Sequence, residues 1–210
     1  MSVTAEQLGF EALLNETDAV NRSRKIERET AHLPGTMSEA LPFYRVLLKQ
    51  HHAVMLAANI DEAMRLRKEA HNLVLRLNGG NKGILAEPDS PGNVLDRESA
   101  ASADATPLWG QSGSFVIEAA DMKARIELEG IFGIAASSFY WPGFSAHAVE
   151  FDRPFLSATG YRSFLGIHAE PVPGITPEEF TRRVVEAYVT RELKGALVPI
   201  AEKYRNRDRR

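Results

Sequence analysis

Apolar residues recur with helical spacing in the first half of the chain. Between residues 38 and 58 they fall at i, i+3, i+4 and i+7, and from 63 to 77 they recur every three or four positions, which marks one face of an α-helix. Asn59 followed by Glu62 is typical of a helix N-cap with a capping box. We therefore expect an antiparallel pair of helices that turns near residue 59, preceded by a more polar helix over residues 4–32.

The second half of the chain has the period of β-strands. Apolar residues alternate strictly with charged ones over residues 123–129, and this segment pairs with 114–119 in a predicted hairpin. The apolar run 130–136 predicts a more central strand, and 145–152 predicts another. Such alternation is typical of an antiparallel sheet with one buried and one charged face, of about four to six strands.

A last helix is predicted to begin after Thr176. Thr176 suits the N-cap, Pro177 the first helical position and Glu179 the capping box, and each of these residues has a physical reason to sit there. The helix has a wide apolar face, so we expect it to lie across the sheet. Helices, then strands, then a helix favour an α+β fold over an alternating α/β fold.

The connection between the two halves has no sustained period. Residues 80–113 are rich in Gly, Pro, Ser, Asp and Ala, and a loop of this length is usually a linker or functional. We expect a helical region over 1–79, a connector or lid over 80–113, and a sheet with its helix over 114–210. The helical and sheet regions are predicted to form one compact unit.

Composition narrows the class of protein. The chain has 210 residues, 44% of them hydrophobic and 25% charged, with a formal net charge of −3, as in an ordinary globular protein. It has no cysteine, which excludes disulfides, thiolate metal sites and cysteine nucleophiles and suits a reducing cytoplasm. The N-terminus lacks the apolar core of a signal peptide, and no run of 18 apolar residues could span a membrane. We expect a cytoplasmic protein without cofactor or metal.

Reactive side chains are densest between residues 141 and 166. His147 could act as a general acid or base, with Tyr161 beside it and Arg162 as an anchor for an anion; these three are the candidate catalytic residues. Packing alternatives remain open: His147 as a neutral core or edge histidine, and Arg162 paired with an acid of the preceding strand. Strand parity puts His147 and Glu150 on opposite faces, so no metal site is predicted.

Two further groups of residues are candidates for binding. The candidate ligand or partner contacts are Trp141, Glu150 and Thr159. The basic C-terminus could contact nucleic acid through phosphate neutralisation, although a solubilising tail is the alternative. Its candidate residues are Lys203, Arg205, Arg207, Arg209 and Arg210.

The segment HAVEFDRPFLSATGYRSFLG, with the TPEEF helix and the terminal LVPIAEKYR, resembles a bacterial family associated with plasmids and mobile elements. The resemblance covers roughly the C-terminal half. It implies a cytoplasmic bacterial protein near DNA-maintenance processes, and it implies no activity and no catalytic residues.

Three functions follow from these observations. The first is a non-enzymatic binding or accessory protein, favoured because no recognised catalytic spacing is present. The second is an enzyme with a pocket formed by His147, Tyr161 and Arg162 that acts on a small anionic substrate. The third is a nucleic-acid accessory factor that uses the basic tail. The wide apolar helix faces also make a homodimer a possible assembly.

Overall fold

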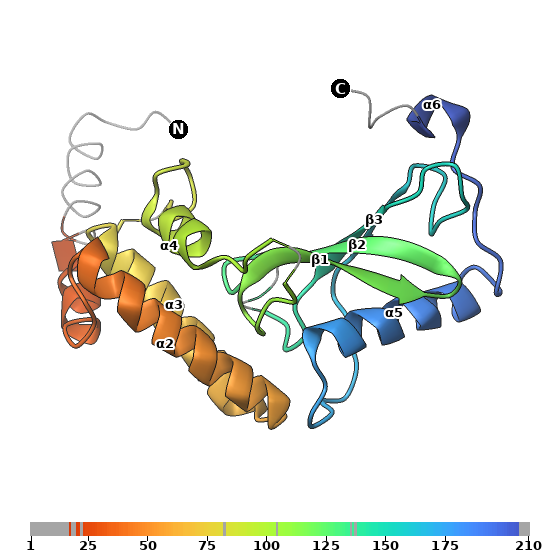
Figure 1. The fold of residues 1–210 in the computed structure, drawn as a ribbon. Helices are drawn as coiled ribbons and strands as arrows, with labels where there is room; N and C mark the ends of the chain where they lie inside the picture. Colours follow the sequence, from red (N-terminus) through yellow and green to blue (C-terminus); the bar gives the residue numbers. More distant parts are fainter. Residues whose placement is uncertain are drawn as a thin grey trace, which may run out of the picture.

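The structure is a computed structural model that describes residue 17 and residues 20–21, 23–81, 83–103, 105–134, 136 and 138–205. Residues 23–29 are helical, which agrees with the end of the first predicted helix, and the start of that prediction lies outside the described residues. Figure 1 shows a helical half and a sheet half side by side. The observed fold is α+β, as the sequence predicts.

Two helices form the expected hairpin. Helix α2 (Met37–Leu56) is followed by α3 (Ile60–Leu77), and the turn between them includes Ala58 in the left-handed region at φ 56°. The Asn59 side chain caps α3 by accepting a hydrogen bond of 3.2 Å from the backbone N–H of Glu62, which confirms the predicted cap. Pro42 lies inside α2, which begins at Met37.

The segment 80–113 contains a helix that the sequence did not reveal. Helix α4 (Pro91–Ser99) begins with a proline at its first position and buries Leu95 completely. A Cβ at Gly92 would lie 2.9 Å from the carbonyl oxygen of Ile84, so only glycine allows this close approach. The expectation of a connector without regular structure is therefore wrong over these nine residues.

Four strands form an antiparallel sheet in the order β1-β2-β3-β4. Their bounds are β1 Ser112–Ala119, β2 Met122–Glu129, β3 Phe144–Ala148 and β4 Tyr161–Phe164. The β1–β2 hairpin is joined by Ala120 and Asp121, both at positive φ (48° and 61°), as a type I′ turn requires. The strand expected over 145–152 ends at Ala148.

The strand predicted over 130–136 is absent from the described residues of that segment, which form turns. Gly130 leaves the sheet at φ 74°, and a Cβ there would lie 2.7 Å from Oδ1 of Asp96. Ile131 and Phe132 are buried against α2, α3 and α4 instead. The apolar run therefore joins the helical half to the sheet half, and this contact explains its composition.

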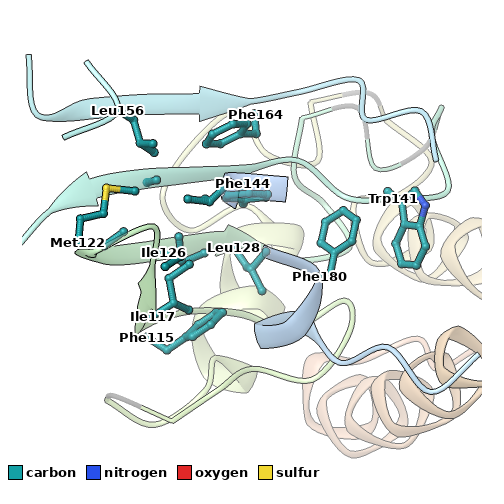
Figure 2. Packing of buried hydrophobic residues seen from close by; sticks show 14 of the residues in the cluster. Phe115, Ile117, Met122, Ile126, Leu128, Trp141, Phe144, Leu156, Phe164 and Phe180 are labelled. Atoms are coloured by element: carbon teal, nitrogen blue, oxygen red, sulfur yellow. The ribbon is translucent and has the colours of Figure 1, made fainter. Parts of the chain in front are cut away.

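Helix α5 (Pro177–Arg191) covers one face of the sheet, and a short helix, α6 (Glu202–Arg205), follows near the C-terminus (Figure 1). The Thr176 side chain caps α5 by accepting from the N–H of Glu179 at 3.2 Å, as predicted. Phe180 packs among aromatic residues of the sheet and loops (Figure 2). No helix in the described part of the chain is long and apolar enough to cross a membrane.

Trp109 connects the two halves and is completely buried. Its backbone N–H donates to Nδ1 of His52 at 3.0 Å, and its carbonyl oxygen lies 2.8 Å from Nδ1 of His51. Its indole N–H donates to the carbonyl of Ile175 at 2.9 Å, and its ring lies against Trp141 and Phe180. Two neighbouring histidines of α2 thus fix the chain just before the sheet begins.

Candidate binding surface

Strand register separates the sheet into two chemically different faces. The face toward α5 carries buried side chains such as Ile126, Phe144 and Phe164, at every second position of each strand. The opposite face, which we call the open face, carries the polar and partly exposed side chains. Its members are Ser114, Val116, Glu118, Lys123, Arg125, Glu127, Glu129, Ser145, His147, Tyr161 and Ser163.

One row of side chains crosses the open face from edge to edge. Val116 is opposite Arg125, Arg125 is opposite His147, and His147 is opposite Tyr161. The two ends of the row are apolar groups in water, since Val116 is 46% exposed and Tyr161 is 45% exposed. The row therefore places a cation and an imidazole between two accessible apolar side chains.

His147 and Tyr161 come together as the sequence hypothesis required. Their rings meet edge to face with centroids 5.0 Å apart. Nε2 of His147 lies 3.1 Å from Oε2 of Glu127 and 3.1 Å from the hydroxyl of Ser145. His147 is therefore a half-exposed residue with polar partners. The alternative of a histidine packed in the core is not observed.

Arg125 is the cation at the centre of the row. Among the described residues its guanidinium has no ion pair or hydrogen bond, whereas Lys123 lies 3.6 Å from Glu118 and His147 lies beside Glu127. Its two cross-strand neighbours are Val116 and His147. An arginine free to donate a bidentate pair of hydrogen bonds is well suited to bind a carboxylate.

Arg162 does not join His147 and Tyr161. It is opposite Ala146, a buried residue of the face toward α5, so it lies on the other side of the sheet. Its guanidinium carbon lies 4.6 Å from the ring centroid of Tyr188 on α5. The expected convergence of the three residues is therefore wrong, because successive residues of a strand point to opposite faces. The alternative pairing with an acid is also not observed.

The three candidate contact residues have separate structural roles. Trp141 is buried, donates its indole N–H to the carbonyl of Ala169 at 2.9 Å and stacks on Phe180 (Figure 2). Glu150 lies beyond β3 and forms an exposed ion pair with Arg153 at 3.3 Å. The hydroxyl of Thr159 donates to the carbonyl of Tyr161 at 3.2 Å. These contacts stabilise the fold and do not assemble a common site.

The basic tail is described only in part. Lys203 lies over the ring of Tyr204 at 4.9 Å, and Arg205 donates to the carbonyl of Ile200 at 2.9 Å. Arg207, Arg209 and Arg210 lie outside the described residues.

The structure has cavities at the β1–β2 turn and beside Arg76. A cavity of about 540 Å³ lies at the β1–β2 turn beside Glu150 and Arg153, and one of about 330 Å³ lies beside Arg76. Neither is lined by His147 or Tyr161. No group of three or more His, Cys, Asp or Glu side chains in the described ranges is placed to hold a metal ion.

Two curated proteins of Escherichia coli, both named Protein KlcB, are similar to this chain. One is 37% identical over 137 residues, which make up 64% of this chain and 32% of the relative. The other is 36% identical over 91 residues, which make up 43% of this chain and 19% of the relative. The chain thus spans about a third or less of the length of the curated relatives it matches. No protein-family model and no solved structure matches the chain.

The similarity to Protein KlcB supports the expected likeness to a bacterial family. The part that residues 147–166 play in that likeness stays a prediction. The name Protein KlcB states no activity, substrate or partner.

Sequence reasoning missed Arg125 and Val116 as members of the surface. The strict alternation over 123–129 correctly assigned Arg125 to the charged face. Its neighbours across the sheet depend on the register that brings β2 beside His147 and β1 beside β2, and no local sequence pattern reveals that register.

Proposed function

We propose that this chain is a non-enzymatic binding protein that recognises a protein partner through the open face of its sheet. The observation that carries the proposal is the row Val116, Arg125, His147 and Tyr161, which crosses all four strands on a face that α5 leaves uncovered. A sheet surface that presents aromatic, arginine and apolar groups in one row suits protein recognition, because tyrosine and arginine are enriched among residues that dominate binding energy.

The charges of this face favour a protein over a nucleic acid. Three carboxylates, those of Glu118, Glu127 and Glu129, stand among two permanent cations, Lys123 and Arg125. A phosphate backbone would meet net repulsion there, since nucleic-acid affinity depends on neutralising phosphates. A protein surface with one carboxylate opposite Arg125 and apolar side chains opposite Val116 and Tyr161 would complement the row.

An enzyme built on the same residues has less support. The proposed anion anchor, Arg162, is on the other face of the sheet, and His147 has Glu127 and Ser145 as its partners. A chain without cysteine suits the reducing cytoplasm, and we place the interaction there.

Charge reversal at the centre of the face tests the proposal. Tagged wild-type protein, Arg125→Glu and Lys49→Glu are purified from bacterial cells that naturally express the chain, and the associated proteins are quantified by mass spectrometry. Lys49 is an exposed cation on α2, so its reversal is the matched control. We expect one or a few proteins to fall at least tenfold with Arg125→Glu and to stay with Lys49→Glu. Equal recovery with both variants would refute the proposal.

A further inference from the structure

Strand β1 is an outer strand of the sheet, and among the described residues no other strand pairs with its outer edge. In a hairpin closed by a two-residue turn, the residues that flank the turn exchange both backbone hydrogen bonds, and bonded and non-bonded pairs then alternate along the ladder. Ala119 and Met122 flank this turn. Ile117, Phe115 and Gly113 therefore bond to β2, while the backbone N–H and C=O groups of Ser114, Val116 and Glu118 point outward.

These six outward groups have no backbone partner among the described residues. At the beginning of the strand, the N–H of Ala101 donates to the carbonyl of Ser112 at 2.9 Å. From Ser114 onward, the outward N–H and C=O groups of β1 are free to form backbone hydrogen bonds. Strand edges of this kind readily pair with another strand.

The opposite edge of the sheet is protected. In β4 the hydroxyls of Ser157 and Thr159 donate to the carbonyl of Tyr161 at 2.7 and 3.2 Å. The N–H of Tyr161 in turn donates to both hydroxyl oxygens, each at 3.3 Å. Side chains thus satisfy the beginning of β4 locally, whereas β1 carries neither a proline nor a lysine that would discourage pairing.

We infer that β1 pairs with β1 of a second copy of this chain, antiparallel and in a register centred on Val116. A twofold axis at Val116 places Val116 opposite its own copy and Ser114 opposite Glu118 of the second copy. All six outward groups of each copy then find a partner. The two four-stranded sheets become one continuous sheet, and the inference rests on this backbone complementarity alone, independently of the proposed function.

The side chains are also self-complementary in this register. On the open face, Val116 is 46% exposed and would be covered by its twin. On the other face, Phe115 of each copy would lie beside Ile117 of the other, an aromatic–aliphatic pair of the kind that stabilises neighbouring strands. Glu118 would face a serine, so no like charges meet.

This assembly differs from the homodimer that the sequence suggested. The wide apolar face of α5 is used within the chain, because Phe180, Val185 and Val189 are buried against the sheet. A backbone-mediated edge contact buries little apolar surface, so we expect a weak dimer whose population rises with protein concentration.

Charge exchange at Val116 tests the register. Val116→Lys places two cations side by side across the axis, and Val116→Glu places two carboxylates there. Neither change touches the bonds within the hairpin, because Val116 and Arg125 form a non-bonded pair. By sedimentation equilibrium at low salt, we expect the wild type to dimerise, each variant alone to dissociate at least tenfold more readily, and the mixture of both variants to recover the dimer.

Val116→Thr serves as the control, since it keeps the backbone donor and the strand preference without charge, and it should dimerise like the wild type. Circular dichroism verifies that each variant is folded. A wild type that stays monomeric up to about millimolar concentration, or a mixture of the two charged variants that fails to associate, would overturn the inference. If the edge of β1 binds a different protein instead, the wild type stays monomeric in this experiment, and that result also overturns the inference.

Discussion

Nε of Arg67 donates a hydrogen bond of 2.9 Å to Nε2 of His51, and both side chains are almost completely buried. Because Nε2 accepts this bond, Nδ1 must carry the imidazole proton, and it donates to the carbonyl of Trp109 at 2.8 Å. The rest of the guanidinium donates to the carbonyls of Ala136, Phe139 and Tyr140. One arginine of α3 thus joins the helical hairpin to the segment that leads into β3.

Removing Arg67 is expected to destabilise the fold severely. Arg67→Met would leave three carbonyls and one imidazole nitrogen without their donor, at a cost of about 3–5 kcal/mol. Urea unfolding followed by circular dichroism measures the loss. Arg65→Met, two positions before Arg67 on the exposed side of α3, is the control and should cost less than about 1 kcal/mol. Equal losses for the two variants would contradict the role assigned to Arg67.

The same network predicts that acid weakens the protein. Burial and the neighbouring Arg67 charge lower the pKa of His51 to about 4, while the unfolded chain has the ordinary value of about 6.5. This stabilisation is complete above pH 6.5 and is lost as the pH falls toward 4, because only the unfolded state gains the proton in that interval. The loss amounts to about 3 kcal/mol.

Urea unfolding at pH 7.5, 5.5 and 4.5 checks this dependence. Burial also lowers the pKa of His52, so the contribution of His51 is the difference between wild type and His51→Gln. We expect the wild type to lose more stability than His51→Gln over this range. A His51→Gln curve parallel to the wild type would disprove the assignment.

How far the sequence determined this fold differs between elements. The caps at Asn59 and Thr176 and the alternation over 123–129 are local signals, and each predicted its element correctly. The strand prediction failed at residues 130–134 because a continuous apolar run does not distinguish a strand from a buried turn. The tertiary structure decides that Ile131 and Phe132 pack on the helices. The separation of Tyr161 from Arg162 follows from the alternation of side chains along a strand, whereas the pairing of His147 with Tyr161 depended on the register of β3 and β4.

The hairpin turn offers a gain in stability. Ala120 and Asp121 occupy positive φ values that cost a residue with a Cβ, and Asn-Gly is the preferred pair for this turn. The double variant Ala120→Asn, Asp121→Gly should raise the free energy of unfolding by about 1 kcal/mol. Thermal and urea unfolding measure the change. A loss of stability would mean that the turn is held differently.

Arg162 is expected to act on stability rather than on binding. Its guanidinium over the Tyr188 ring should couple the two residues by about 0.5–1 kcal/mol. A double-mutant cycle of Arg162→Met and Tyr188→Leu measures this coupling in urea unfolding. Arg162→Met should leave the proteins recovered with the wild type unchanged. Absence of coupling would mean that the contact with Tyr188 does not stabilise the fold, and loss of a bound protein would mean that Arg162 contributes to binding.

Photo-crosslinking in living cells tests most directly the claim that the open face is the binding surface. A photoreactive phenylalanine analogue replaces Tyr161 in one strain and Val46, an exposed residue of α2, in another. We predict a discrete crosslinked product of defined mass from position 161 and none from position 46, and we predict that adding Arg125→Glu removes the product. No product at position 161, or the same product from both positions, would contradict the account.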